Sequence, residues 1–192
     1  MEPLDDLKKL IFSVEPINDS AWDSLASKWT EVKFSRKMLI TRQGQVERYL
    51  YFVKSGIQRA FFDHNGREGT LVFTYSPSFS GVLDSFLLQS PSSVSLEALT
   101  PSILMRLSFD DLQFLMSEHR SIETWVRKAL AIALAGTLQR QQELITYSSE
   151  ERFKAFLGRS PHLLQVIPQK YLASYLGIDP TNFSKFLSTV KI

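Results

Sequence analysis

The sequence predicts an α+β fold in which short antiparallel strands come first, a long helix follows and a compact helical pair ends the chain. Between residues 31 and 108, short β-branched or aromatic runs alternate with turn residues, a pattern typical of a β-barrel, jelly roll or sandwich. Residues 121–146 contain no proline and indicate one helix of roughly 40 Å. Residues 168–188 have the spacing of two short helices joined by a glycine turn.

The composition is that of an ordinary folded protein of 192 residues, with 44% hydrophobic and 22% charged residues. No run of about 18 apolar residues occurs, so the sequence predicts no membrane span. The N-terminus also lacks the pattern of an export signal. The chain has no cysteine, which fits a reducing compartment and excludes disulfides and thiolate catalysis. We therefore expect a cytoplasmic protein.

The first 120 residues are expected to form helices followed by a β domain. Residues 1–30 have helical periodicity, with Asn18 or Asp19 as the cap of one segment. The Asn65–Gly66 pair predicts a tight hairpin turn between two of the strands. The strand-like runs, in order, are EVKF, KMLI, RYLYFV, IQRAFF, TLVFTY and SLEAL.

Helices are predicted over most of the chain after residue 108. A Ser-x-x-Asp cap opens a short helix at 108–119, the long helix follows at 121–146, and another helix spans 149–158. The run QVIP at 165–168 is expected to be a short strand. The long helix is either an internal core helix or a dimer helix, and the candidate dimer residues are Ile122, Val126, Ala129, Ala133 and Gly136.

The C-terminal segment has the pattern of a helix-turn-helix. Gly177 lies at the turn, where a positive φ is favoured only without a Cβ. Asp179 and Pro180 form the cap and first residue of the second helix. The expected packing positions are Leu172, Leu176, Ile178, Phe183 and Phe186. The residues left outward are Thr181, Asn182, Ser184, Lys185 and Ser188. They are small or hydrogen-bonding, which suits contact with bases in a major groove.

Charge is distributed unevenly along the chain. Residues 1–126 carry 13 Lys and Arg against 16 Asp and Glu, whereas residues 127–192 carry 9 against 4. The basic excess therefore coincides with the helix-turn-helix, which favours double-stranded DNA as the partner of that part.

The order of these elements resembles that of the Crp/Fnr superfamily of bacterial transcription regulators. The likeness is carried by residues 38–81 and 93–108, with a Gly44 turn, a Gly56 strand corner and the Asn65–Gly66 hairpin. The resemblance implies a homodimer with three parts. A cyclic-nucleotide-binding-like β-roll at 1–120 would sense a small effector. The long dimerisation helix at 121–146 would pair with a second copy, and the helix-turn-helix domain at 147–192 would bind near-palindromic DNA.

By the same resemblance, the candidate effector residues are Gly81, Val82, Leu83, Ser92 and Ser93. Relatives that bind cyclic AMP carry a glutamate where this chain has Val82, and an arginine where it has Ser92. Valine accepts no ribose hydroxyl and serine supplies no fixed charge for a phosphate. We therefore expect an effector other than cyclic AMP, or none.

The second departure lies in the last helix. Recognition helices of this family commonly present arginine and glutamate, whereas Lys185 and Lys191 are the only charges after Asp179. An alternative is therefore a ligand-binding or scaffold dimer whose helix-turn-helix no longer reads DNA. A cyclic-nucleotide sensor is a further alternative.

Catalytic and metal sites are not expected. His64, His119 and His162 lie far apart in the sequence, and no nucleophile, metalloprotease or phosphate-loop motif occurs. The sequence thus predicts no catalytic residues, no metal and no cofactor, and the chain is not expected to be an enzyme.

Overall fold

The computed structural model describes residues 4–189 and confirms the α+β fold. Within this range, eight strands form two antiparallel four-stranded sheets in a jelly roll. The first sheet has the order β1 (Thr30–Phe34), β8 (Ser102–Ser108), β3 (Tyr49–Ser55), β6 (Ser78–Ser80). The second has the order β2 (Leu39–Thr41), β7 (Ser95–Ala98), β4 (Ile57–His64), β5 (Arg67–Tyr75).

Two turns in the roll depend on glycine. The predicted Asn65–Gly66 hairpin is confirmed, since both residues have positive φ, 55° and 77°, between β4 and β5. Gly56, at the corner between β3 and β4, has φ of 91°. A Cβ there would lie 2.6 Å from the carbonyl oxygen of Pro101, so a larger residue cannot occupy the corner without moving the backbone.

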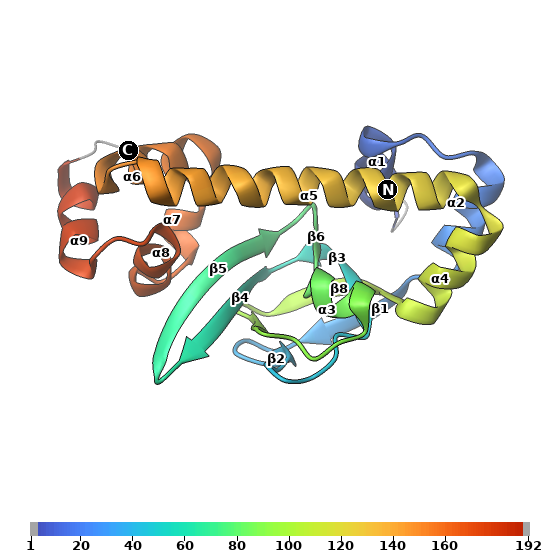
Figure 1. The fold of residues 1–192 in the computed structure, drawn as a ribbon, viewed down its shortest axis with the longest axis horizontal. Helices are drawn as coiled ribbons and strands as arrows, with labels where there is room; N and C mark the ends of the chain where they lie inside the picture. The colour runs from blue at the N-terminus through green and yellow to red at the C-terminus, as the bar shows by residue number, and fades with distance from the viewer. Residues whose placement is uncertain (1–3, 190–192) are drawn as a thin grey trace.

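Helices cover one side of the first sheet (Figure 1). They are α1 (Asp5–Val14), α2 (Asp19–Ala26) and α4 (Phe109–Glu118). The predicted caps are confirmed, because Asn18 Oδ1 accepts the Ala21 N–H at 2.8 Å and Ser108 Oγ accepts the Asp111 N–H at 3.1 Å. Beneath them, Trp22, Phe52 and Trp125 belong to one buried apolar cluster.

The long helix α5 (Arg120–Thr146) extends along the molecule from α1 to the C-terminal helices (Figure 1). Its first turns pack into the N-terminal cluster through Ile122 and Trp125. Residues 131–139, in contrast, are all exposed. The middle of α5 therefore lacks the packing that usually stabilises a helix in a single chain.

The C-terminal part contains α6 (Ser149–Arg159), α7 (Leu163–Val166), α8 (Gln169–Leu176) and α9 (Pro180–Thr189). The strand predicted at residues 165–168 is wrong. The Ile167 N–H donates to the Leu163 carbonyl at 3.0 Å, and Pro168 is the N-cap of α8. A short apolar run does not distinguish a strand from one helical turn.

Three further elements were not predicted: β6, β8 and the short helix α3 (Leu83–Leu88). The C-terminal helices also share an apolar cluster with the β-roll. Ile57, Phe73 and Leu99 of the roll pack with side chains of α6 to α9. These helices are thus packed directly on the sheet that contains β4 and β5.

Candidate nucleic-acid interface and sensor site

Helices α8 and α9, which we call the reader, form a helix-turn-helix around Gly177. Gly177 has φ of 62°, and the Ile178 N–H returns to the Ala173 carbonyl at 3.0 Å to close α8. Asp179 Oδ1 accepts the Thr181 N–H at 2.9 Å, as predicted for a cap. The predicted packing positions Leu172, Leu176, Ile178 and Phe183 are buried, and Phe186 is partly buried.

The residues predicted to read DNA lie together on the outer side of α9. Thr181, Asn182, Ser184, Lys185 and Ser188 are all exposed. We call these five residues the reading face. Ser188 Oγ donates to the Lys185 carbonyl of its own helix at 2.7 Å. The inner side of α9 rests on α6, where Phe153 meets Phe183 edge-on at 5.5 Å. Lys191 lies outside the described residues.

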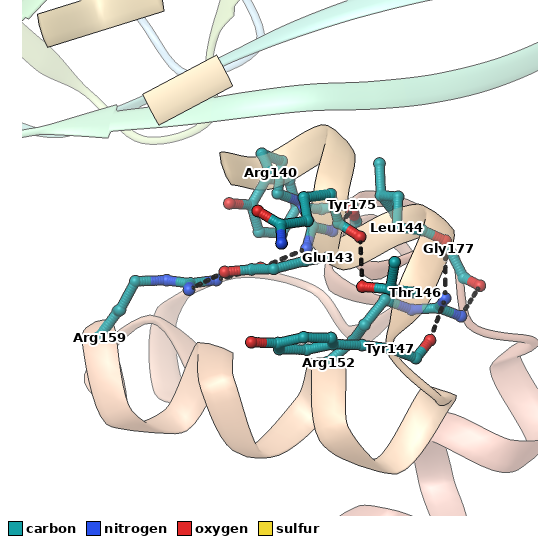
Figure 2. Close-up of polar contacts among 10 residues, drawn as sticks. Arg140, Glu143, Leu144, Thr146, Tyr147, Arg152, Arg159, Tyr175 and Gly177 are labelled. Carbon is teal, nitrogen blue, oxygen red and sulfur yellow. Dashed lines mark hydrogen bonds and ion pairs between the residues drawn. The ribbon is translucent and has the colours of Figure 1, made fainter. Parts of the chain in front are cut away.

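A buried carboxylate joins α5 to α6, and its partner Arg140 reaches the reader. Glu143 accepts two hydrogen bonds from Arg159 of α6 and a third from Arg140 at 3.1 Å (Figure 2). Arg140 also donates to the backbone carbonyl of Tyr175 in α8. Its guanidinium carbon lies 4.4 Å from the centroid of the Tyr175 ring. The hydrogen bonds from Arg159 hold the pKa of Glu143 below its usual value, although burial acts in the opposite direction.

Arg152 closes the turn between α5 and α6. Its guanidinium donates to the carbonyls of Leu144 and Tyr147 at the end of α5, at 3.3 and 3.0 Å. It also donates to the Gly177 carbonyl of the reader turn at 3.0 Å (Figure 2). Carbonyls that end a helix lack partners within it, so Arg152 satisfies them and fixes the reader to α5. This link to the reader could not be predicted from the sequence, because Gly177 lies 25 residues from Arg152 in the chain.

The five predicted effector residues do not line one common ligand pocket. Val82 is buried with Ala60, Val94 and Leu96 inside the roll. Leu83, in contrast, packs against the cluster between α1 and α5.

The two serines do not converge on a ligand either. Ser92 Oγ donates to the Val94 carbonyl at 2.6 Å, whereas Ser93 is exposed. Gly81 has φ of 126°, and a Cβ added there would lie 3.2 Å from the carbonyl oxygen of Tyr49. The segment thus presents apolar and neutral groups where a cyclic nucleotide needs an acceptor and a positive charge.

A cavity of about 490 Å³ opens elsewhere in the roll, between β1, β2, β3 and β8. Tyr49, Tyr51 and Arg106 line it, and none of the five predicted effector residues does. Glu47 borders the cavity, and burial raises the pKa of its carboxyl. Hydrogen bonds from Thr41 and from backbone N–H groups act in the opposite direction. Because these donors already occupy Glu47, it serves the loop rather than a ligand.

The predicted dimer residues fall into two groups. Ile122 is fully buried in the N-terminal cluster, so its prediction as an interface residue is corrected: its own chain covers it. Val126 and Ala129 are partly buried against the same cluster. Ala133 and Gly136 are exposed. A different, exposed apolar stripe follows α5 at intervals of four, four and seven residues: Leu130, Leu134, Leu138 and Ile145.

Within the described residues, no group of three or more His, Cys, Asp or Glu side chains is arranged to hold a metal ion. Across the same part of the chain, no helix has the length and apolar character needed to cross a membrane.

The profile of the cyclic nucleotide-binding domain family matches residues 31–119. No curated protein matches the chain. One similar solved structure is FixK2 from Bradyrhizobium japonicum, with a TM-score of 0.74 and 17% identity, covering 83% of each chain.

Two further structures are similar to this chain. A transcriptional regulator assigned to the Crp/Fnr family, from Eubacterium rectale, gives a TM-score of 0.70 at 17% identity, covering 90% of this chain and 82% of that one. The c-di-GMP-responsive global regulator CLP from Xanthomonas campestris gives 0.66 at 19%, covering 89% and 90%. At these identities the likeness establishes the fold.

Replacing Glu143 by Gln is expected to destabilise the protein by about 3 kcal/mol at pH 7, because Arg140 loses its buried counter-charge. The pKa of Glu143 is lower in the folded than in the unfolded state. Its stabilisation is therefore complete above the unfolded value of about 4.3 and is lost as pH falls through the folded value. Urea denaturation from pH 7 to about pH 3 measures this difference.

The matched control is Glu150→Gln, which removes an exposed partner of Lys154 and should cost less than about 0.5 kcal/mol. Equal stability of wild type and Glu143→Gln at pH 7 contradicts the role of this carboxylate.

Proposed function

We propose that this chain, which has the Crp/Fnr fold and a cyclic nucleotide-binding domain at residues 31–119, is a non-catalytic DNA-binding transcription regulator of that superfamily. The β-roll would respond to a small effector other than cyclic AMP. A homodimer would present two copies of the reader to double-stranded DNA. The proposal rests chiefly on one observation, the exposed polar face of α9 on a buried two-helix support.

The chemistry of the reading face supports contact with bases. Asn182 has the amide that pairs bidentately with adenine, and Lys185 has an ammonium that reaches guanine acceptors. Thr181 and Ser184 have hydroxyl groups that donate or accept. The first turn of α9 is already capped by Asp179, so the helix is formed before DNA is bound.

The exposed stripe on α5 supports a second copy as the partner. Its residues Leu130, Leu134, Leu138 and Ile145 are 37–75% exposed and lie on one face of a helix whose middle, residues 131–139, is exposed throughout. An apolar stripe along one face of a helix packs against another element in most proteins. The stripe therefore suits self-association better than the small residues Ala129, Ala133 and Gly136 do.

The alternative, a scaffold dimer with a non-reading helix-turn-helix, is favoured by the low charge of the reading face. Among its five described residues, Lys185 is the sole cation. DNA affinity distinguishes the two functions, because phosphate contacts release counterions and make binding fall with salt.

Replacing Asn182 or Lys185 by Ala is expected to weaken binding to a sequence selected from a random DNA pool by about 1–3 kcal/mol. Lys185→Ala should also reduce the slope of log affinity against log salt by about 1. Lys9→Ala, an exposed charge on α1, is the control and should change neither. Wild-type affinities from both variants refute the reading face, and a wild type without sequence preference supports the scaffold.

Titration calorimetry with cyclic AMP and cyclic GMP is expected to show no binding at ligand concentrations up to about 1 mM. Loss of each charge-assisted hydrogen bond costs about 1.5–3 kcal/mol, and Val82 and Ser92 replace both partners. Micromolar binding of either nucleotide overturns the assignment of a different effector.

Replacing Leu134 and Leu138 together by Glu is expected to convert a dimer into a monomer of 22.0 kDa, because the four leucines that the dimer would bury become four like charges. Sedimentation velocity measures the mass. The control is Gln139→Glu, which adds a charge at an exposed position of α5 outside the stripe. A double variant that stays dimeric shows that the interface lies elsewhere.

A further inference from the structure

Arg59 lies in β4 and is a fully paired cation inside the protein. Its side chain is 2% exposed. Nε donates to Glu97 Oε1 at 2.7 Å, Nη2 to Glu68 Oε2 at 2.9 Å, and Nη1 approaches Thr70 Oγ1 at 3.4 Å. A buried guanidinium needs such partners, because leaving its charge unpaired is costly.

Two aromatic rings lie against this guanidinium. The ring centroid of Phe61, from the same strand, lies 4.1 Å from the guanidinium carbon, and the ring centroid of Tyr171 lies 3.9 Å from it. Tyr171 belongs to α8, so one side of a β-roll cation is covered by the reader. Cation–π contacts are strongest where water is excluded. Water is excluded from Arg59, because its side chain is 2% exposed.

The same strand edge makes further contacts with α8. Strand β5 is at the edge of its sheet and has a bulge at Leu71, between the pairs Ala60–Val72 and Phe61–Thr70. The Thr70 N–H beside this bulge donates to Ser174 Oγ of α8 at 3.0 Å. An edge N–H otherwise requires water, so α8 continues the hydrogen bonding of the sheet. Packing of Phe73 on Tyr175, with centroids 5.3 Å apart, adds apolar contact.

We propose that the contact between Arg59 and Tyr171 positions the reader, fixing the distance between the two reading faces that a dimer offers to DNA. This inference rests on the proposed function. Tyr171 belongs to α8, whereas the reading face belongs to α9 and is exposed while α8 is docked. With α8 docked on the roll, the reading face can still contact DNA. Docking also fixes the orientation of the reader in advance, so DNA binding does not have to pay that entropy cost.

The contact is also connected to a third element of the roll. Glu97, the closest partner of Arg59, is in β7, which pairs with β4 at Arg59. Tyr171 therefore rests on a cation that β4 and β7 hold together.

The first experiment compares two DNA molecules, a palindrome and a single half-site. Tyr171→Leu removes the aromatic face, and we expect about tenfold weaker binding to the palindrome with unchanged binding to the half-site. Tyr171→Phe keeps the ring and should behave as wild type on both. Equal losses on both DNA molecules overturn the proposal, because they indicate that Tyr171 supports the fold of the reader or touches DNA.

The second experiment needs no DNA. The chain has no cysteine, so Leu71→Cys and Gln169→Cys, both at exposed positions, place one pair of spin labels on β5 and α8 of each protomer. We expect a narrow distance distribution that broadens in Tyr171→Leu and stays narrow in Tyr171→Phe. An unchanged distribution in Tyr171→Leu refutes the positioning contact.

The two readouts separate the two ideas. A wild type that binds no DNA refutes the proposed regulator, whereas the label distances still decide whether Tyr171 holds α8 on the roll.

Discussion

One apolar cluster extends from the β-roll into the C-terminal helices, and the place of the reading face depends on it. Ile57, Phe73 and Leu99 come from the roll, and Phe156, Leu163 and Leu172 come from the helices that support α9. Burial of such side chains stabilises by about 1.5–3 kcal/mol each. The polar contacts around it, from Arg59 to Glu143, then select one orientation of the docked helices, because they require matched geometry.

The β-roll has the architecture of a cyclic nucleotide-binding domain, but Val82 and Ser92 give it neutral groups at two of the expected contact positions. Val82 is part of the roll's packing, and the Ser92 hydroxyl is used within its own loop. The 490 Å³ cavity instead has tyrosine and arginine side chains on its wall. A fold can therefore retain its strands and turns while the ligand it accepts changes, since the strands are held by packing that the ligand does not supply.

The features predicted from sequence are those with local causes. The Asn65–Gly66 hairpin, the Asn18 and Ser108 caps and the turn at Gly177 follow from backbone preferences of neighbouring residues.

Long-range contacts left no such signal. The roles of Arg59 and Glu143 depend on partners in other elements. The prediction for Ile122 was corrected for the same reason. An apolar pattern on a helix shows which face is buried, but it does not show whether the same chain or a second copy covers that face. The strand predicted at 165–168 is wrong because α7 ends within this segment and Pro168 is the N-cap of α8.

The length and stiffness of α5 have a mechanical consequence. This helix of 27 residues spans about 40 Å, with its first turns in the N-terminal core and its last turns bonded to the reader. It is thus a lever: a tilt of about 5° at the core end displaces the far end by roughly 3.5 Å. That displacement is close to the rise of one base pair, about 3.4 Å, so under the proposed function a repacking too slight to alter the fold would change where the reader meets DNA.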